Sequence, residues 1–409
     1  MKRLFRHIGT LAGIVPAGVL RKEGAAMDEV GTIADAWLLT DDGRIADFGG
    51  PADPMPEHID DTVDCAGGLL MPAFCDSHTH IVYAGCRDGE FLDKINGLSY
   101  EEIAARGGGI LNSADLLHRT SEDELFRQSM ERVNEMIAQG TGAIEIKSGY
   151  GLNPVDEMKM LRVIDRIKAT SPALVRSTFL GAHAVGRGYT HEDYVAAVCR
   201  MMPEAARYAD FVDIFCEEGF FTVEDAARVL EAGLRAGLRP KIHANQLAVS
   251  GGVQVGVRFG ALSVDHLEKS GVDEIAALQG AETMPTFLPG SAFFLRIPDG
   301  PARAYIAAGL GVALASDYNP GSSPSGDMRW IWALGCIRMR LTPAQAFNAV
   351  TLNSAYAMGV SDVTGSITVG KRADLILTRP GWNLTKIPYL HHSPFIRQVY
   401  LQGKPDISA

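Results

Sequence analysis

The sequence lacks the marks of several protein classes. Its six cysteines include no Cys-x-x-Cys pair and are too sparse over 409 residues for a disulfide framework, so we expect a reducing cytoplasm. No apolar run approaches the roughly 20 residues of a membrane span. Basic charge is not in excess either: the formal net charge is −11, which disfavours nucleic acid or an anionic membrane as a partner. A small soluble molecule is the expected ligand.

A cleavable leader is also disfavoured. The basic start at 1–6 is followed by a stretch that Gly9, Gly13 and Pro16 interrupt, whereas a signal peptide needs an unbroken apolar segment. The chain does contain 46% hydrophobic residues, 21% charged residues and 44 glycines, which suffices for a sizeable core. Its length fits a large α/β barrel that carries additions.

The middle of the chain alternates strands with helices. One predicted helix covers 122–139, and two others begin after the capping residues Asn153 and Thr222. Eight strands separated by helices predict a (β/α)8 TIM barrel rather than an open sheet. The predicted strands, each an apolar or β-branched run, are 69–76, 142–147, 174–180, 211–216, 239–243, 261–265, 282–287 and 311–316.

Both ends of the chain have β character. Residues 1–66 contain short strands separated by turns, while 365–377 predict two strands around a Gly-Lys turn, followed by another at 399–403. We therefore predict a small β-sandwich domain formed by both termini, from 1–66 and 361–409. The catalytic barrel would occupy 67–360.

Two histidines two positions apart end the first predicted barrel strand, as His78 and His80. Side chains at i and i+2 leave an extended chain on the same face, so both imidazoles can hold one metal ion. Imidazole is the commonest protein ligand for zinc and suits iron. Because an isolated His-x-His pattern recurs by chance, the interpretation depends on what the other strands contribute.

Later strands also end in polar side chains, and in a barrel all these ends meet on one face. The residues concerned are Lys147, His183, His243, His266 and Asp317. Three imidazoles and one carboxylate, with a position left for water, make a catalytic metal site. No lysine follows the fourth strand to bridge a second ion, so we predict one metal. Its ligands would be His78, His80, His243 and Asp317.

Position assigns roles to the remaining residues. A divalent ion lowers the pKa of bound water toward about 7, so that hydroxide can attack an amide or amidine carbon. His266 would contact that water or the developing oxyanion, and His266 and Asp317 would carry the proton. His183 would serve substrate, metal or packing, with substrate favoured. For Lys147 we expect a structural ion pair.

The sequence resembles the amidohydrolase superfamily of metal-dependent hydrolases over nearly its whole length. The resemblance is carried by His78-Thr79-His80, His243, His266 and Ser316-Asp317, and by the segment 365–375 with its Gly-Lys-Arg-Ala-Asp-Leu ending. It implies a barrel hydrolase with zinc or iron at the four ligands. It also implies a homodimer.

A narrower match rests on the stretches 76–87, 147–152, 181–184 and 316–322. It implies hydrolysis of the ring C–N bond of 4-imidazolone-5-propanoate to N-formimidoyl-L-glutamate in histidine degradation. The substrate contacts that it implies are Arg87, Tyr150, His183, Gln246, Asn319, Gly321 and Ser322. The chemistry agrees, because a guanidinium can grip a carboxylate tail in bidentate fashion.

One departure concerns Gln246, three residues after His243, where related deaminases have a glutamate. An amide orients a ring by hydrogen bonds but is neither acid nor base near neutral pH, which disfavours deamination. The alternative within the superfamily is another cyclic amide or amidine hydrolase, or a heterocycle deaminase. A non-catalytic scaffold is disfavoured by the complete ligand set.

Overall fold

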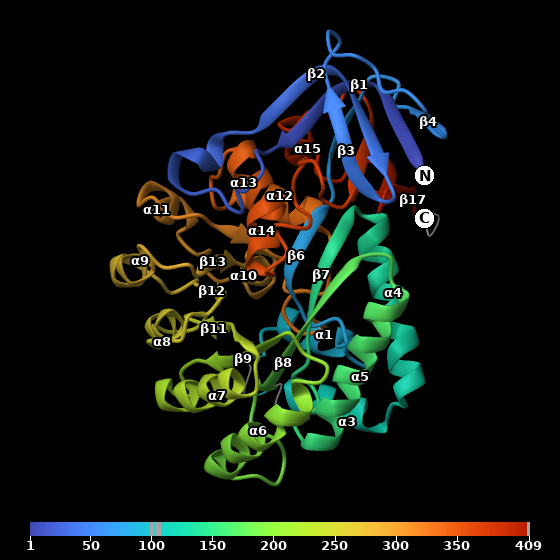
Figure 1. The fold of residues 1–409 in the computed structure, drawn as a ribbon. Helices are drawn as coiled ribbons and strands as arrows, with labels where there is room; N and C mark the ends of the chain where they lie inside the picture. Colours follow the sequence, from blue (N-terminus) through green and yellow to red (C-terminus); the bar gives the residue numbers. More distant parts are fainter. Residues whose placement is uncertain (99–101, 103–107, 407–409) are drawn as a thin grey trace.

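Two sheets organise the chain in the computed structural model, which describes residues 1–98, 102 and 108–406. Figure 1 shows a barrel with helices around its outside and a smaller β domain beside it, where both termini lie. Residues 407–409, the end of the predicted C-terminal segment, fall outside the described part. No helix among the described residues is both long and apolar enough to span a bilayer.

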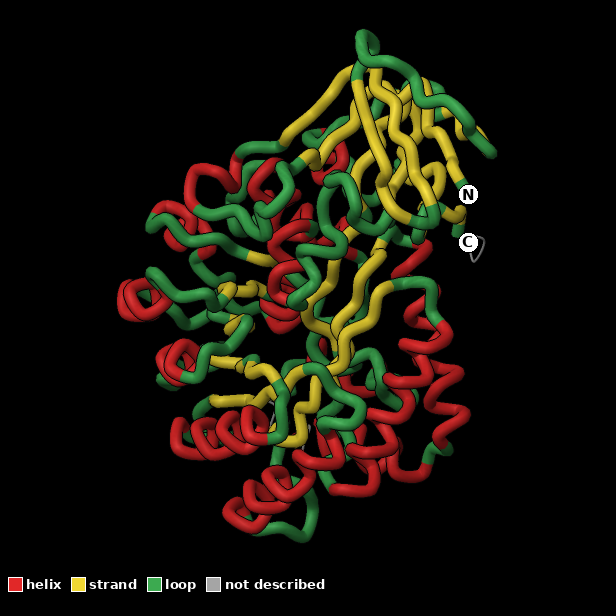
Figure 2. The backbone as a smooth tube through the Cα atoms, viewed as in Figure 1, coloured by secondary structure: helices red, strands yellow, loops and turns green. Residues whose placement is uncertain are grey.

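The barrel consists of parallel strands joined in chain order, seen in yellow in Figure 2. It closes where the backbone after the last strand returns to the first: Asp317 N donates to His78 O at 3.0 Å, and His80 N donates to Tyr318 O at 2.9 Å. The carboxyl ends of all strands therefore meet on one face. The strands are β6 (Phe74–Thr79), β7 (Thr141–Lys147), β8 (Leu174–Ala182), β9 (Phe211–Cys216), β11 (Ile242–Ala244), β12 (Ser263–His266), β13 (Met284–Phe287) and β14 (Ala313–Leu314), with β10 (Arg239–Pro240) paired to β9.

Helices cover the outside of the barrel (Figure 1). The side chains of Asn153, Thr190 and Thr222 each accept a hydrogen bond from the third residue of the helix that follows. The helices predicted at 122–139 and after Asn153 and Thr222 are confirmed. In chain order the helices are η1 (Gly24–Asp28), α1 (Asp88–Ile95), α3 (Ile110–Arg119), α4 (Glu122–Ala138), α5 (Pro154–Thr170), α6 (His191–Ala205), α7 (Val223–Arg235), α8 (Gly252–Arg258), α9 (Val272–Leu278), α10 (Pro289–Leu295), α11 (Ala302–Ala307), α12 (Met328–Ile337), α13 (Pro343–Val350), α14 (Leu352–Ala357) and α15 (Lys386–Tyr389).

The second sheet combines strands from both chain ends. Phe5, Leu38, Leu70, Leu375 and Tyr400 bury together in one core, in which the rings of Phe5 and Tyr400 pack edge to face. A sheet that encloses a core of its own fits the predicted β-sandwich domain. In spatial order its strands are β17 (Lys404–Pro405), β16 (Ile396–Leu401), β15 (Leu375–Pro380), β5 (Gly68–Pro72), β1 (Lys2–Ile14), β2 (Gly31–Asp41) and β3 (Arg44–Gly49), with β4 (Asp61–Asp64) beside β1.

Two strand predictions are wrong. The apolar run 69–76 is not a single barrel strand, because β5 pairs with β1 and β15 of the small sheet and only β6 enters the barrel. Of the two strands predicted in 365–377, the first is reduced to one bridge between Ile367 and Ile14, and the second is β15. The strand predicted at 399–403 corresponds to β16.

Candidate active site

Three histidine side chains meet at the carboxyl end of the barrel. Within the described part of the chain, one group of potential ligand atoms lies within 4.8 Å of one another, and it comprises His78, His80 and His243. His80 Nε2 lies 3.2 Å from His78 Nε2 and 3.5 Å from His243 Nε2. Asp317 joins them, with Oδ1 3.5 Å from His78 Nε2 and 3.4 Å from His80 Nε2. The structure therefore brings the four predicted ligands together.

The spacing of these atoms fits a metal ion. A tetrahedral zinc ion with ligand bonds of about 2.05 Å separates its ligands by about 3.4 Å, close to the distances found here. Burial lowers the pKa of His78, and that of His243 to about 4, so both imidazoles are neutral, which is the form that ligates. The donor set indicates a divalent metal.

Aspartates contact the far nitrogens of two of these imidazoles. Asp265 Oδ2 on β12 lies 2.7 Å from His78 Nδ1, and Asp213 Oδ2 on β9 lies 2.9 Å from His243 Nδ1. Such contacts keep Nδ1 protonated and direct Nε2 toward the cluster. The sequence analysis missed both residues. The sequence did contain a sign of their role, because each is a charged residue inside an apolar barrel strand, and a buried charge requires a partner.

His266 stands beside the cluster without belonging to it. Its ring centre lies 5.4 Å from that of His243 and 5.7 Å from that of His78. Burial by itself would lower the pKa of His266, but the charges of Glu268 and Asp317 outweigh burial and raise this pKa to about 9. A raised pKa favours the protonated form of His266, which can donate a proton or stabilise an anion next to the cluster.

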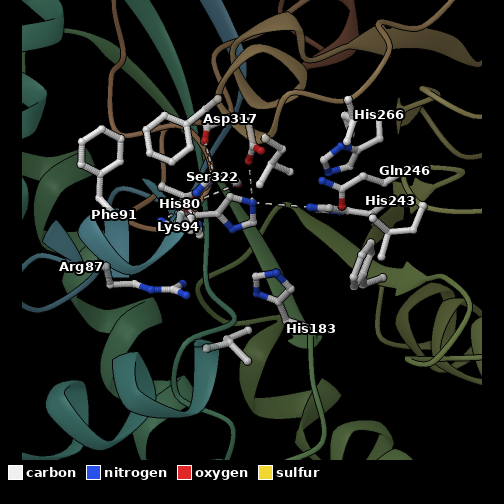
Figure 3. A pocket seen from close by; sticks show the side chains of 18 of the residues that line it. His80, Arg87, Phe91, Lys94, His183, His243, Gln246, His266, Asp317 and Ser322 are labelled. Atoms are coloured by element: carbon white, nitrogen blue, oxygen red, sulfur yellow. Dashed lines mark hydrogen bonds and ion pairs between the residues drawn. The ribbon is translucent and has the colours of Figure 1, made fainter. Parts of the chain in front are cut away.

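A cavity of about 730 Å³ opens over the histidines, a size typical of small-molecule sites. Figure 3 shows His80 at its centre, Arg87 and Lys94 on one side, and His243, Gln246 and His266 on the other. Every residue predicted to contact substrate lines this cavity. These are Arg87, Tyr150, His183, Gln246, Asn319, Gly321 and Ser322, together with His80, His243, His266 and Asp317.

Glu90 holds the Arg87 guanidinium in place. Nε and Nη2 of Arg87 donate to Glu90 Oε2 at 2.9 and 2.5 Å, while Nη1 lies against Gly321, where an added Cβ would collide with it. Lys94, on α1, donates from Nζ to Gly321 O at 2.7 Å. Arg87 and Lys94 thus form a cationic wall. Lys94 was not predicted, because nothing in the pattern of α1 distinguishes it from a surface lysine.

His183 and Tyr150 form another wall. The His183 ring stacks on that of His80 with centres 5.1 Å apart and an angle of 17°, and the Tyr150 ring lies 5.5 Å from His183. His183 Nδ1 lies 3.1 Å from Gly149 O. Gly149 has a φ of +114°, and a Cβ there would lie 2.9 Å from that nitrogen, so the close approach requires glycine.

Asn319 and Gln246 lie on loops that side-chain hydrogen bonds to backbone N–H groups stabilise. Asn319 Oδ1 accepts from Gly321 N and Ser322 N, both at 2.8 Å, so this side chain shapes its loop as well as lining the cavity. The backbone N–H of Gln246 donates to Glu217 Oε2 at 2.7 Å. The sequence analysis missed Glu217, a buried acid directly after β9. Its position at the end of a barrel strand is the one feature of the sequence that could have indicated a role in the site.

Comparisons with known proteins agree with this geometry. The Amidohydrolase family model matches residues 244–405. Imidazolonepropionase of Flavobacterium johnsoniae is 49% identical over 99% of this chain and 100% of its own length, and that of Geobacillus kaustophilus is 38% identical over 92% and 90%. Among solved structures, an adenosine deaminase from Xanthomonas campestris with bound zinc has a TM-score of 0.73 at 18% identity, covering 98% of this chain and 92% of its own.

A 5-methylcytosine deaminase from Klebsiella pneumoniae has a TM-score of 0.75 at 14% identity, covering 97% of this chain and 98% of its own. At such identities these structures establish the fold alone. Barrel, histidine cluster and matched family model together define a metal-dependent hydrolase of the amidohydrolase class. The full-length identities are more specific: the chain belongs to the imidazolonepropionase family.

Proposed function

We propose that this protein hydrolyses the ring C–N bond of 4-imidazolone-5-propanoate to give N-formimidoyl-L-glutamate, a step of histidine degradation. The observation that carries the proposal is the cavity itself, which has the histidine cluster at its floor and the Arg87 guanidinium at its side. A heterocyclic substrate with a carboxylate tail would use the histidine cluster for hydrolysis of the ring and the guanidinium for binding of the tail. The name imidazolonepropionase borne by the full-length relatives supports the same reaction.

His78, His80, His243 and Asp317 would hold one metal ion, for which we propose zinc or iron. When bound, such an ion activates water and polarises a carbonyl. Asp317 is placed to accept a proton from the attacking water, and His266, which lies beside His243 and His78, to stabilise the oxyanion. As water oxygen bonds to the ring carbonyl carbon, the C–N bond breaks and the leaving nitrogen takes up a proton.

Side chains at the cavity walls orient the ring. Nη1 of Arg87, on the side away from Glu90, can bind the propanoate, because a charge-assisted hydrogen bond in a partly dry site is strong. His183 and Tyr150 offer flat faces for the heterocycle. Asn319 and Ser322 add polar groups to the lining of the cavity.

Gln246 separates this reaction from heterocycle deamination. It lines the cavity three residues after His243, and its amide can orient a ring nitrogen but cannot shuttle a proton. We therefore expect loss of imidazolone absorbance without release of ammonia. Ammonia release from a panel of heterocycles would favour the deaminase alternative instead.

Replacement of Arg87 tests the substrate assignment. Arg87→Met should raise KM for 4-imidazolone-5-propanoate by about 10- to 100-fold, since a charged hydrogen bond contributes about 1.5–3 kcal/mol, with metal content unchanged. Arg127→Met is the matched control, because Arg127 also pairs with a glutamate three residues away but lies exposed on α4. An unchanged KM for Arg87→Met would remove Arg87 from the anion site. Ultraviolet assay and metal analysis are made on one sample.

We also propose a cytoplasmic homodimer. The cytoplasm is supported by the cysteines, all six of which are free in the structure. The resemblance to the superfamily supports the dimer, and light scattering coupled to gel filtration measures it. A monomeric mass at micromolar concentration would contradict it.

A further inference from the structure

A buried network of charges lies beneath the histidine cluster, and Lys147 is its hub. This lysine ends β7 and is 0% exposed, as are the three carboxylates around it. Its Nζ lies 2.6 Å from Glu145 Oε1, 2.9 Å from Asp213 Oδ2 and 3.6 Å from Asp265 Oδ2. Because each buried carboxylate is costly without a cation, one ammonium here compensates several acids.

The two aspartates in contact with Lys147 are those that contact the cluster. The oxygen of Asp213 that faces Lys147 also lies 2.9 Å from His243 Nδ1, and the oxygen of Asp265 that faces Lys147 also lies 2.7 Å from His78 Nδ1. The ammonium of Lys147 therefore contacts both carboxylates that hold the imidazoles of His243 and His78. Those imidazoles come from opposite parts of the barrel, on β6 and β11.

We propose that Lys147 is a positioning residue of the metal centre: one ammonium fixes Asp213 and Asp265, and through them the orientation of His243 and His78. The ammonium sets the spacing of two carboxylates, each of which aligns an imidazole. Partners behind metal ligands of this kind typically affect metal affinity by 10- to 100-fold. The inference rests on the proposed metal ligands but not on the proposed substrate.

Lys241 provides a matched control inside the same network. It is also 0% exposed and also pairs with Glu145, while its remaining hydrogen bonds go to the carbonyls of Ser77 and Ala357 at 3.2 and 3.1 Å. Within the described part of the chain, Lys241 forms no ion pair with Asp213 or Asp265. Removing it therefore removes a buried cation that pairs with neither aspartate, although its charge also acts on Asp265 from beyond ion-pair distance.

Titration with cobalt(II) tests the proposal without any enzyme assay. Metal-free wild type, Lys147→Met and Lys241→Met are titrated, and visible absorption gives both the affinity and the ligand geometry. We expect Lys147→Met to bind cobalt 10- to 100-fold more weakly with a shifted spectrum, and Lys241→Met to stay within about threefold of wild type with the wild-type spectrum. Equal losses for the two variants, or no loss for Lys147→Met, would overturn the proposal.

Folding is monitored by circular dichroism of each metal-free protein. Should Lys147→Met not fold, Lys147→Arg and Lys147→Gln take its place, because arginine keeps the charge and glutamine keeps a donor only. Tighter cobalt binding by Lys147→Arg than by Lys147→Gln supports the proposal, and equal binding by these two variants contradicts it. If wild type itself fails to bind cobalt, the proposed metal ligands are wrong, an outcome distinct from a failure of Lys147.

Discussion

At the level of single residues, the site uses backbone conformations that residues with a side chain seldom adopt. His266 has a φ of 91° and Asp317 a φ of 54°. Each such conformation costs on the order of 1–3 kcal/mol. The hydrogen bond from Asp317 N to His78 O helps to maintain one of them. His266 and Asp317, the two proposed proton carriers, thus have strained backbone conformations. The site keeps this strain because it directs both side chains toward the cluster.

Replacement of His266 separates a role in proton transfer from a role in metal binding. His266→Gln should lower kcat by about 10²–10⁴-fold, the usual contribution of a general acid or base, while metal per chain stays at the wild-type value. His243→Gln is the comparison variant and should lose the metal. Atomic absorption and steady-state kinetics on the same preparations provide the data. Metal loss in His266→Gln would make His266 a ligand instead.

Gly321 should be sensitive to the smallest substitution. Because a Cβ there would collide with Arg87 Nη1, Gly321→Ala should displace the guanidinium and raise KM about tenfold, with cobalt affinity unchanged. Gly89→Ala is the control, since Gly89 lies two residues from Arg87 with nothing within 4 Å of an added Cβ. Steady-state kinetics over a range of substrate concentrations measures both. A KM for Gly321→Ala equal to that of Gly89→Ala would contradict this.

At the level of elements, local pattern predicted the barrel strands but not which sheet each run joins. Leu70 and Phe74 are both fully buried, so 69–76 looks like one apolar strand, yet the chain leaves the small sheet between β5 and β6. One of the two partners of β5 is β15, near the other end of the chain, and a local apolar run carries no information on so distant a pairing.

The four proposed metal ligands could be chosen from the sequence because the chemistry of a metal site demands particular residue types at strand ends. Asp213, Asp265 and Glu217 could not be predicted, because an acid that supports the site looks like any other acid until its partner is known. The same holds for Lys147, whose predicted ion pair is confirmed but whose two contacts toward the cluster depend on the closed barrel.

The loop between β7 and α5 should make stability depend on pH. The Glu157 carboxylate accepts hydrogen bonds from the backbone N–H groups of Gly149, Gly151 and Leu152, yet burial outweighs these bonds and raises its pKa from 4.5 to about 7. The folded state therefore holds this proton more tightly than the unfolded state. Its contribution to stability is full below pH 4.5 and is lost as pH rises through 7.

Glu157→Gln removes that titration. Between pH 4.5 and 8 the unfolding free energy of wild type should fall by about 3 kcal/mol more than that of the variant, because each pH unit between the two pKa values is worth about 1.4 kcal/mol. Urea unfolding of both metal-free proteins at several pH values measures the difference. Parallel curves for the two proteins would show that Glu157 does not titrate in this range.

At the level of the whole molecule, the proposed metal links distant parts of the chain. Its proposed ligands come from β6 and the residue that follows it, from β11 and from the segment after β14, so the ion would join the first and last strands where the barrel closes. The closing contacts at that point are backbone hydrogen bonds from Asp317 and His80. A bound cation adds ligand bonds at the same junction, and binding only to the folded chain shifts the folding equilibrium.

Removal of the metal should therefore destabilise the entire barrel and not only stop catalysis. At a free metal concentration 100 times Kd, binding contributes about 2.7 kcal/mol, so treatment with a chelator should lower Tm by several degrees, and added zinc should restore it. His243→Gln is the control: its Tm should be the same with and without chelator. If wild type that demonstrably holds one metal ion per chain, and loses it to the chelator by metal analysis, kept its Tm, the ion would not favour the folded barrel over the unfolded chain.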